Sequence, residues 1–338
     1  MLAIPKLSER HKGSRWRMGR VIEFLRYAAK RLIGLALVMW LVATMVFLIL
    51  RVIPGDPVQI IAGIDVVDRA ALAEMRAELG LDQPILVQYV NWLANAARGD
   101  LGISIRTRTP VTTLVGRALP VTIELALFSF IIGVGLSIPA GTLAARQKGQ
   151  FSDALVTSGA LIGISLPSYV LALVGIYLFA VRLHLLPSGG WVSLAKDWVQ
   201  NLKLLILPSV TLGLVTAGTL VRMLRRNLVD EMEEDYVRTA RAKGAGEVRV
   251  FYGHALRNAM IPYVTIAGIE AGVLLSGSVI TESIFAIPGL GRLMISNIYD
   301  RDYPVVQGAV FVIAAMYVLM NFVVDLLYAW LDPRVSLR

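Results

Sequence analysis

Long uncharged runs separated by shorter polar segments dominate the chain. Five runs of 18 residues or more carry no charged side chain, and a sixth is interrupted only by Glu270. Crossing the hydrocarbon core of a bilayer takes ~20 apolar residues as a helix, whereas barrel strands need only ~10 alternating residues. The pattern therefore predicts an all-α membrane protein with six transmembrane helices, at residues 32–50, 125–145, 154–181, 204–221, 258–281 and 303–324.

The first long polar segment, residues 54–118, contains two stretches with helical periodicity. Residues 68–79 place apolar side chains on one face and end at Gly80. Asp82 is expected to cap a second helix, with Pro84 in its first turn and apolar residues on one face as far as Leu93. We predict two short amphipathic helices on the outer side of the membrane.

Composition agrees with a membrane protein and narrows the chemistry. Hydrophobic residues make up 56% of the chain and charged residues 17%, against about 25% charged in soluble domains. The absence of cysteine excludes disulfides and Cys-based metal sites, and three scattered histidines do not make a zinc site. The chain also lacks the P-loop, G-x-S-x-G and H-E-x-x-H patterns. We expect no enzymatic activity and no cofactor bound by this chain.

The net charge of +9 is distributed as a topology signal, which argues against nucleic-acid binding. Of the 33 Lys and Arg residues, 21 lie in segments 1–31, 146–153, 222–257 and 331–338, which six spans place on one side. Lys and Arg favour the cytoplasmic side, so both termini are expected there. Residues 1–17 are expected to be a disordered basic tail before an N-terminal segment, 18–53, and either Met1 or Met18 could be the start. Residues 332–338 form the C-terminus.

Two acids and several prolines fall within the apolar runs. Glu124 lies near the outer end of the second predicted span and Glu270 near the middle of the fifth. An acid in lipid is a functional candidate by default. The competing interpretation, which we favour, is a structural partner for a hydroxyl or amide on a neighbouring helix, such as Thr122, Ser129 or Ser276. Pro139, Pro167, Pro208 and Pro262 predict kinks.

A polar, small-residue segment at 235–262 separates the fourth and fifth spans. Ala240, Ala242 and Gly244 are interleaved with Arg238, Arg241 and Lys243. Small residues let another backbone approach closely, and the charges suit a wet, polar contact rather than lipid. The segment predicts a protein-docking surface, with an ordinary solvated loop as the alternative.

Ordered motifs along residues 18–334 resemble one family. They are RVIPGDP at 51–57, ELGLDQP at 78–84, GDLGIS at 99–104, SIFAIPGLG at 283–291, RDYPVVQG at 301–308 and DPR at 332–334. The chain thereby resembles the inner-membrane permeases of peptide-type ATP-binding cassette (ABC) importers, which handle dipeptides, oligopeptides, nickel complexes, glutathione and similar solutes. The resemblance does not identify the solute.

The resemblance also implies a role for the polar segment. Such permeases carry a loop with the pattern E-A-A, three residues, Gly, nine residues, I-x-L-P, whose short helix docks on a cytoplasmic ATPase. With Gly244 as the Gly, Arg238, Thr239 and Ala240 take the E-A-A places and residues 254–257 take the I-x-L-P places. Ala240, Gly244 and Leu256 match the pattern, Arg238 and Arg257 do not, and proline comes five residues late at Pro262. The implied coupling residues are Asp235, Tyr236, Arg238, Thr239, Ala240, Arg241, Ala242, Lys243, Gly244 and Leu256.

The family implies a type I ABC importer permease fold, with a core at 119–331 and a cytoplasmic coupling loop at 222–260. Expected partners are a second homologous permease in a heterodimer, two ATP-binding subunits that carry ATP and Mg, an extracytoplasmic solute-binding protein and the bilayer. Expected contacts with the binding protein are Asp100, Gly102, Arg301 and Asp302, and Glu124, Pro167, Glu270 and Ser276 are candidates for the translocation path. Two alternatives remain: an ion-coupled transporter with Glu270 as proton carrier, and a non-transporting membrane scaffold.

Overall fold

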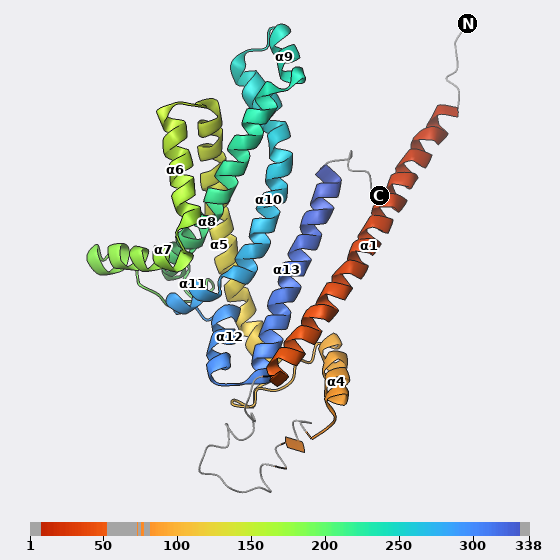
Figure 1. Ribbon diagram of the computed structural model, residues 1–338, viewed down its shortest axis with the longest axis vertical. Coiled ribbons are helices and arrows are strands. Elements are labelled where there is room, and N and C mark those ends of the chain that lie inside the picture. Colours follow the sequence, from red (N-terminus) through yellow and green to blue (C-terminus); the bar gives the residue numbers. More distant parts are fainter. Residues whose placement is uncertain (1–7, 53–72, 74–75, 78–81, 332–338) are drawn as a thin grey trace.

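The computed structural model describes residues 8–52, 73, 76–77 and 82–331. Within these residues the protein is a bundle of long helices, and each long helix contains a segment apolar enough to cross a membrane (Figure 1). The same runs that lack charge in the sequence form these helices, because a helix satisfies most of its backbone N–H and C=O groups within itself, as lipid requires. They are α1 (Ser8–Val52), α5 (Val111–Arg146), α8 (Trp198–Glu233), α10 (Leu256–Gly277) and α13 (Tyr303–Leu331).

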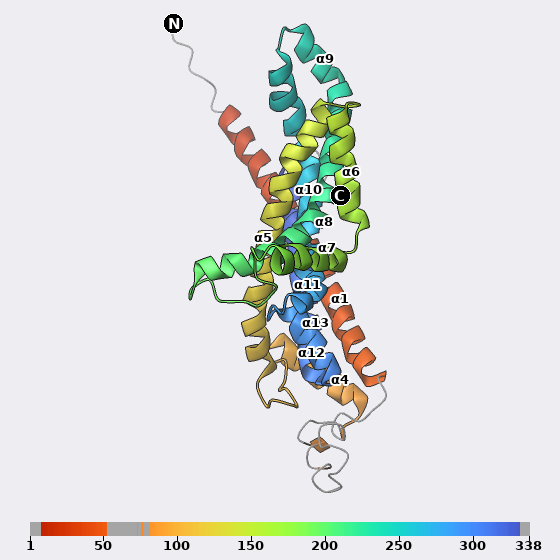
Figure 2. The same ribbon diagram turned by 90° about the vertical axis from the view of Figure 1, so that its left-hand side faces the viewer.

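The sixth predicted span is broken. Helix α6 (Phe151–Ser165) is followed by α7 (Ser168–Gly175), which continues as the π-helical η1 (Ile176–Arg182), and the two halves meet at an angle of 102°. Pro167 lies at the break and lacks the N–H that a continuous helix would need, and the residue before it is extended. Helix α7 therefore lies across the bundle (Figure 2). The span predicted over 154–181 is thus a bent pair of helices, and the kink predicted at Pro167 is a sharp break.

Glycines bring α5 and α8 into close contact along the centre of the bundle. A Cβ at Gly133 of α5 would lie 2.9 Å from the Thr216 side chain, and one at Gly213 of α8 would lie 2.8 Å from Ile132. Side chains at these two positions would force the helices apart. Small residues at helix contacts are the usual means of close packing in membranes, where lipid offers no hydrophobic drive to associate.

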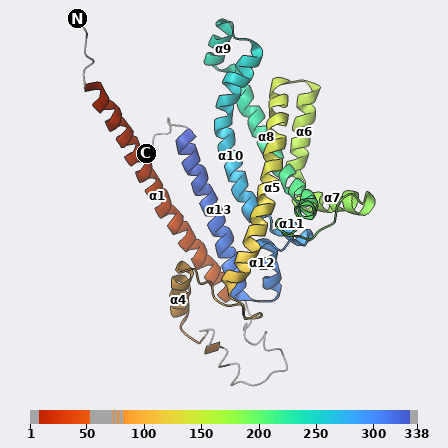
Figure 3. The same cartoon turned by 180° about the vertical axis from the view of Figure 1, so that it is seen from behind.

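Short helices lie at the two ends of the bundle. One end carries α9 (Asp235–Ala242), the turn between α5 and α6, and the N-terminal end of α1, with the π-helical η2 (Arg249–Ala255) leading from α9 into α10 (Figures 1 and 3). The other end carries α4 (Ile85–Ala97) and α12 (Leu290–Tyr299). The basic segments that the sequence places on one side of the membrane thus share one end, as far as the described residues extend.

Several boundaries differ from the expected ones. Helix α4 confirms the second amphipathic helix, but it begins after Pro84 rather than at an Asp82 cap. Most of the first one, residues 68–79, lies outside the described residues. Residues 8–17 belong to α1, where disorder was expected. Helix α5 begins at Val111, so the expected boundary at 118–119 falls inside a helix.

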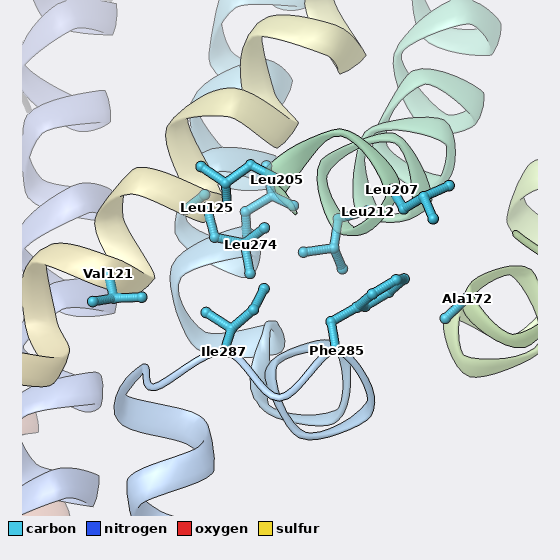
Figure 4. Packing of buried hydrophobic residues seen from close by; sticks show 10 residues of the cluster. Val121, Leu125, Ala172, Leu205, Leu207, Leu212, Leu274, Phe285 and Ile287 are labelled. Atoms are coloured by element: carbon cyan, nitrogen blue, oxygen red, sulfur yellow. The ribbon is translucent and has the colours of Figure 1, made fainter. Parts of the chain in front are cut away.

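A buried cluster near the middle of the molecule fixes α11 (Val279–Ile284) and the turn that follows it. Phe285 and Ile287, both fully buried, insert between α5, α8 and α10 (Figure 4). Burying a side chain of this size stabilises the fold by about 1.5–3 kcal/mol. The turn is therefore an integral part of the core, and the cluster consists of Val121, Leu125, Ala126, Ala172, Leu205, Leu207, Leu212, Leu274, Phe285 and Ile287.

Candidate functional site: the α9 arm and the outer segments

Helix α9 stands at the tip of an arm formed by α8 and by η2 with α10. Val237, which is fully buried, anchors the helix to the arm. Its other side chains lie at least partly at the surface, with Ala240 half-buried. The arm therefore presents a short polar helix with a small-residue surface, as the sequence predicts.

Gly244 ends α9 by adopting a left-handed backbone conformation with φ of +83°. Its N–H donates to Arg241 O at 2.9 Å, and the Ala245 N–H donates to Ala240 O at 3.1 Å. This pair of bonds is a Schellman ending, in which glycine is preferred because a Cβ is strained at positive φ. No atom lies within 4 Å of where a Cβ would stand. Gly244 is therefore required by the turn, a reason that sequence analysis did not identify.

Ion pairs lie along the exposed side of α9. Arg238 donates to Asp235 at 3.2 Å, and Arg241 donates to Glu247 at 2.9 Å. The Tyr236 hydroxyl donates to the Glu231 carboxylate, and burial together with this bond raises the pKa of Tyr236 to about 12. Exposed pairs of this kind contribute little stability and can exchange for partner contacts.

The arm is joined to the bundle by packing and by polar contacts. Leu256 is half-buried against a cluster that includes Leu224, Leu228 and Phe251. It holds α10 against α8, so it belongs to the base of the arm. Lys148, in the turn between α5 and α6, donates to Glu233 at the end of α8 at 2.9 Å.

A buried ion pair that sequence analysis missed joins α6 to α8. Asp153 is 4% exposed and accepts two hydrogen bonds from Arg225, at 2.5 and 2.7 Å. The same carboxylate accepts from the Gly149 N–H at 2.9 Å. Asp153 directly follows a polar turn and reads as a surface residue, so no sequence signal marks the pair.

The two acids within the predicted spans have different neighbours. Glu124 accepts from Trp191 Nε1 at 3.0 Å and from Asn201 Nδ2 at 2.9 Å, which ties α5 to α8 and to the loop before it. Glu270 lies half-buried beside Thr219 of α8. None of the three hydroxyls suggested as partners from the sequence bonds to Glu124 in the described structure.

The other two path candidates lie apart from these contacts. The Ser276 hydroxyl donates to carbonyls of its own helix, Gly272 O and Val273 O, at 3.3 and 3.2 Å. Pro167 is exposed at the break between α6 and α7. The four candidates thus come from three places: α5 holds Glu124, α10 holds Glu270 and Ser276, and Pro167 lies at the break between α6 and α7. Among the described residues, no hydrogen bond or ion pair links these three places.

The outer segments are joined through Asp302. Its side chain is fully buried and accepts from Ser104 Oγ at 2.5 Å and from two backbone N–H groups, Ile105 at 3.3 Å and Arg106 at 3.2 Å. Asp302 therefore fixes residues 104–106 to the start of α13, and its carboxylate is not available to an external partner. Arg106 adds an ion pair with Asp300.

The remaining outer candidates are accessible. Asp100 is exposed and accepts from the Gly102 N–H at 2.9 Å. Gly102 has a φ of +88°, and Arg301 is exposed with a φ of +55°. The turn at Asp100–Gly102 and the turn at Arg301 are thus each adjacent in sequence to a residue of the Ser104–Asp302 contact or close to it.

Glu282 is a second buried acid that sequence analysis missed. It is fully buried, and its Oε1 accepts from Thr122 Oγ1 and Ser278 Oγ, each at 2.8 Å. Its Oε2 accepts from the Arg292 N–H at 3.1 Å, and Thr122 in turn accepts from the Leu290 N–H at 2.8 Å. Together they satisfy the free N–H groups that begin α12. The predicted fifth span ended at Thr281, one residue too early to include Glu282.

The described residues thus form a bundle of membrane-spanning helices with one broken span and a polar helix on a projecting arm, an arrangement compatible with a membrane transport subunit. The chain belongs to the binding-protein-dependent transport system inner membrane component family. The family model matches residues 137–337, and the model for the N-terminal part of these membrane components matches residues 24–126.

Known relatives cover nearly the whole chain. A glutathione transport system permease protein of Escherichia coli K12 is 40% identical over 93% of this chain and all of its own length. A probable peptide ABC transporter permease of Sinorhizobium fredii is 38% identical over 91% of this chain and 98% of its own length. The inward-facing MetNI methionine ABC transporter supports the fold, with a TM-score of 0.53 at 22% identity over 65% of this chain and 96% of its own.

The family and the helices confirm the main prediction. The protein is a peptide-type ABC importer permease and a multi-pass inner-membrane protein, and ATPase and binding-protein partners belong to its family's mode of action. The six predicted spans correspond to five long helices and one bent pair in the described residues.

Proposed function

We propose that this chain is one half of the pathway by which a peptide or similar small solute crosses the membrane, driven by ATP hydrolysis on partner subunits. Its relatives carry peptide and glutathione transport in their names. The chain itself would be non-catalytic, with ATP and Mg held by two cytoplasmic ATPase subunits. The other half would be a second, similar permease.

The observation that carries the proposal is the exposed helix α9 on its rigid arm. A helix that docks on a moving partner must offer accessible backbone and small side chains, and it must be joined firmly to what it moves. Residues Thr239, Ala242 and Lys243 are exposed, while Val237 is fully buried beneath them. We propose that this surface fits a cleft on the ATPase.

The contacts at the base of the arm support transmission of movement. Lys148–Glu233 and Asp153–Arg225 join the inner end of α8 to α5 and α6, and Leu256 joins α10 to the same region. A shift of α9 would therefore move α5, α6, α8 and α10 together. Such a rigid-body rotation is how packed helices alternate between two arrangements.

The orientation follows from charge. The α9 end of the bundle holds the Lys- and Arg-rich segments, so we place it and both termini in the cytoplasm. The opposite end, with Asp100, Gly102 and Arg301, would then meet the solute-binding protein. Asp302 would act indirectly, by holding the two outer turns in one surface. The four path candidates stay proposals, with Glu124 as a structural tie between α5 and α8.

Substitution of Gly244 tests the docking surface. Gly244→Ala and Gly244→Arg both introduce a Cβ at positive φ and share a backbone strain of about 1–2 kcal/mol. Only arginine adds a long charged side chain, which would extend into the open space next to the end of α9. We expect Gly244→Arg to lower solute-stimulated ATPase activity and uptake in the assembled transporter by more than tenfold relative to Gly244→Ala.

Equal activity of the two variants, at equal membrane levels, would contradict docking at this surface. Arg182→Ala serves as a control, because it changes an exposed arginine on η1, which continues α7 and is not part of the arm. It is expected to leave coupling at the wild-type level.

A further inference from the structure

A groove of about 590 Å³ lies between α1 and α13, where the two helices diverge toward the α9 end (Figures 1 and 3). Its walls are apolar along most of their length, and the apolar side is formed by Gly34, Val38 and Val42 of α1 and Ala314, Val318 and Phe322 of α13. Both walls belong to membrane-spanning segments. The function proposed above does not use this groove.

Charge is concentrated at one end of the groove. Lys30 and Arg31 lie there with one carboxylate, that of Asp325. Arg31 forms an ion pair with Asp325, with 3.1 Å between the nitrogen and the carboxylate oxygen. Lys30 is exposed and has no carboxylate partner among the described side chains. Among the side chains that the structure describes, one positive charge is thus left in excess at this end of the groove.

The length of the groove distinguishes between possible occupants. From Lys30 to Val42 a helix rises ~18 Å. That is close to one leaflet of hydrocarbon, about 15 Å, whereas a transmembrane helix of another chain would need ~30 Å. An occupant with an anionic end and an apolar tail of one leaflet's length matches both the length and the charge, and the volume is that of a small-ligand site.

We propose that the α1–α13 groove binds one anionic phospholipid, with the phosphate at Lys30 and an acyl chain along Gly34, Val38 and Val318. Basic pockets between transmembrane helices on the cytoplasmic side are a known form of lipid recognition. Assignment to the inner leaflet rests on the orientation proposed above, but the site itself does not. The lipid would fill the space between α1 and the rest of the bundle and so fix the position of α1.

Native mass spectrometry of the assembled transporter tests the site, with phosphatidylglycerol and phosphatidylethanolamine of identical acyl chains as probes. Lys30→Gln is expected to weaken phosphatidylglycerol binding about fivefold, the effect of one lysine near an anionic headgroup, and to leave phosphatidylethanolamine unchanged. Gly34→Leu is expected to weaken both lipids, because open space surrounds Gly34 and a leucine there fills the groove without a clash. Gly159→Leu, which also points into open space but on α6, and Lys203→Gln are the matched controls.

If Lys30→Gln and Gly34→Leu both retain phosphatidylglycerol as well as the wild-type protein does, the proposal is overturned. A second result would also overturn it. Because the chain has no cysteine, Val38→Cys provides a unique thiol in the groove. Efficient crosslinking of this thiol to the partner permease would show that protein, not lipid, occupies the groove. Both readouts are independent of transport, so they stand even if the docking role of α9 fails.

Discussion

Removal of the Glu282 side chain should destabilise the outer half of the protein. The carboxylate is fully buried and accepts hydrogen bonds from Thr122, Ser278 and the Arg292 backbone. The space beside it is filled by the backbone, because a Cβ at Gly289 would clash with the carboxyl group. In Glu282→Ala the donors lose their acceptor, and the N-terminus of α12 loses its cap.

The expected loss is about 3–5 kcal/mol, since each buried unpaired donor costs about 1–3 kcal/mol and entry of water recovers part of the sum. A chain of this size loses roughly 2 °C of Tm per kcal/mol, so the transition should fall by roughly 6–10 °C. The measurement is thermal unfolding of the purified protein in one detergent at fixed pH. The Tm of Glu282→Gln should fall between those of wild type and Glu282→Ala. The amide oxygen of glutamine can still accept hydrogen bonds, but its amide nitrogen is a donor and cannot replace the second carboxylate oxygen as an acceptor.

Two further variants make the reasoning refutable. Asp82→Ala removes an exposed carboxylate and should leave the Tm within about 1 °C. Thr122→Val should destabilise alone but add little to Glu282→Ala, because both residues belong to one hydrogen-bond network. A Tm of Glu282→Ala equal to that of Asp82→Ala would refute the view that this carboxylate holds α12 in place.

Three further predictions concern other parts of the chain. Arg225→Ala leaves the buried Asp153 without its ion-pair partner and should lower the free energy of unfolding by about 3–5 kcal/mol, measured as a Tm shift. Adding Asp153→Asn should recover part of this loss, and strictly additive Tm shifts of the two single variants would contradict the pairing. Glu270→Gln should keep at least half of the uptake, because glutamine can still bond Thr219, and complete loss at normal membrane levels would favour a proton carrier. A chain that starts at Met18 should insert with its N-terminus inside and transport normally, because four basic residues remain before the first span; an inverted first helix, detected by cysteine labelling, would show that residues 1–17 set the topology.

The membrane class, the six spans and the polar arm could be predicted from the sequence alone. An uncharged run of about 20 residues is long enough to cross the membrane as a helix, and few other structures can hold so long an apolar segment. The positions of Lys and Arg indicate which side of the membrane each loop occupies, without any tertiary contact. Family membership followed from ordered motifs that are local in sequence. The small residues of the surface that we propose for docking were visible for the same reason, because Ala240, Ala242 and Gly244 are close together in the chain.

Only the tertiary structure decided which polar residues are buried and what they join. Asp153 and Arg225, and likewise Ser104 and Asp302, are far apart in sequence, and no local pattern brings them together. Asp302 looks like a surface residue of an outer loop, yet three donors that converge on it make it a buried tie. Pro167 predicts a kink, but only the structure shows a break of 102°, after which Ala172 of α7 packs in the same buried cluster as Phe285. Hydropathy measures the cost of leaving water, and the partner that offsets this cost is set by the packing of distant helices.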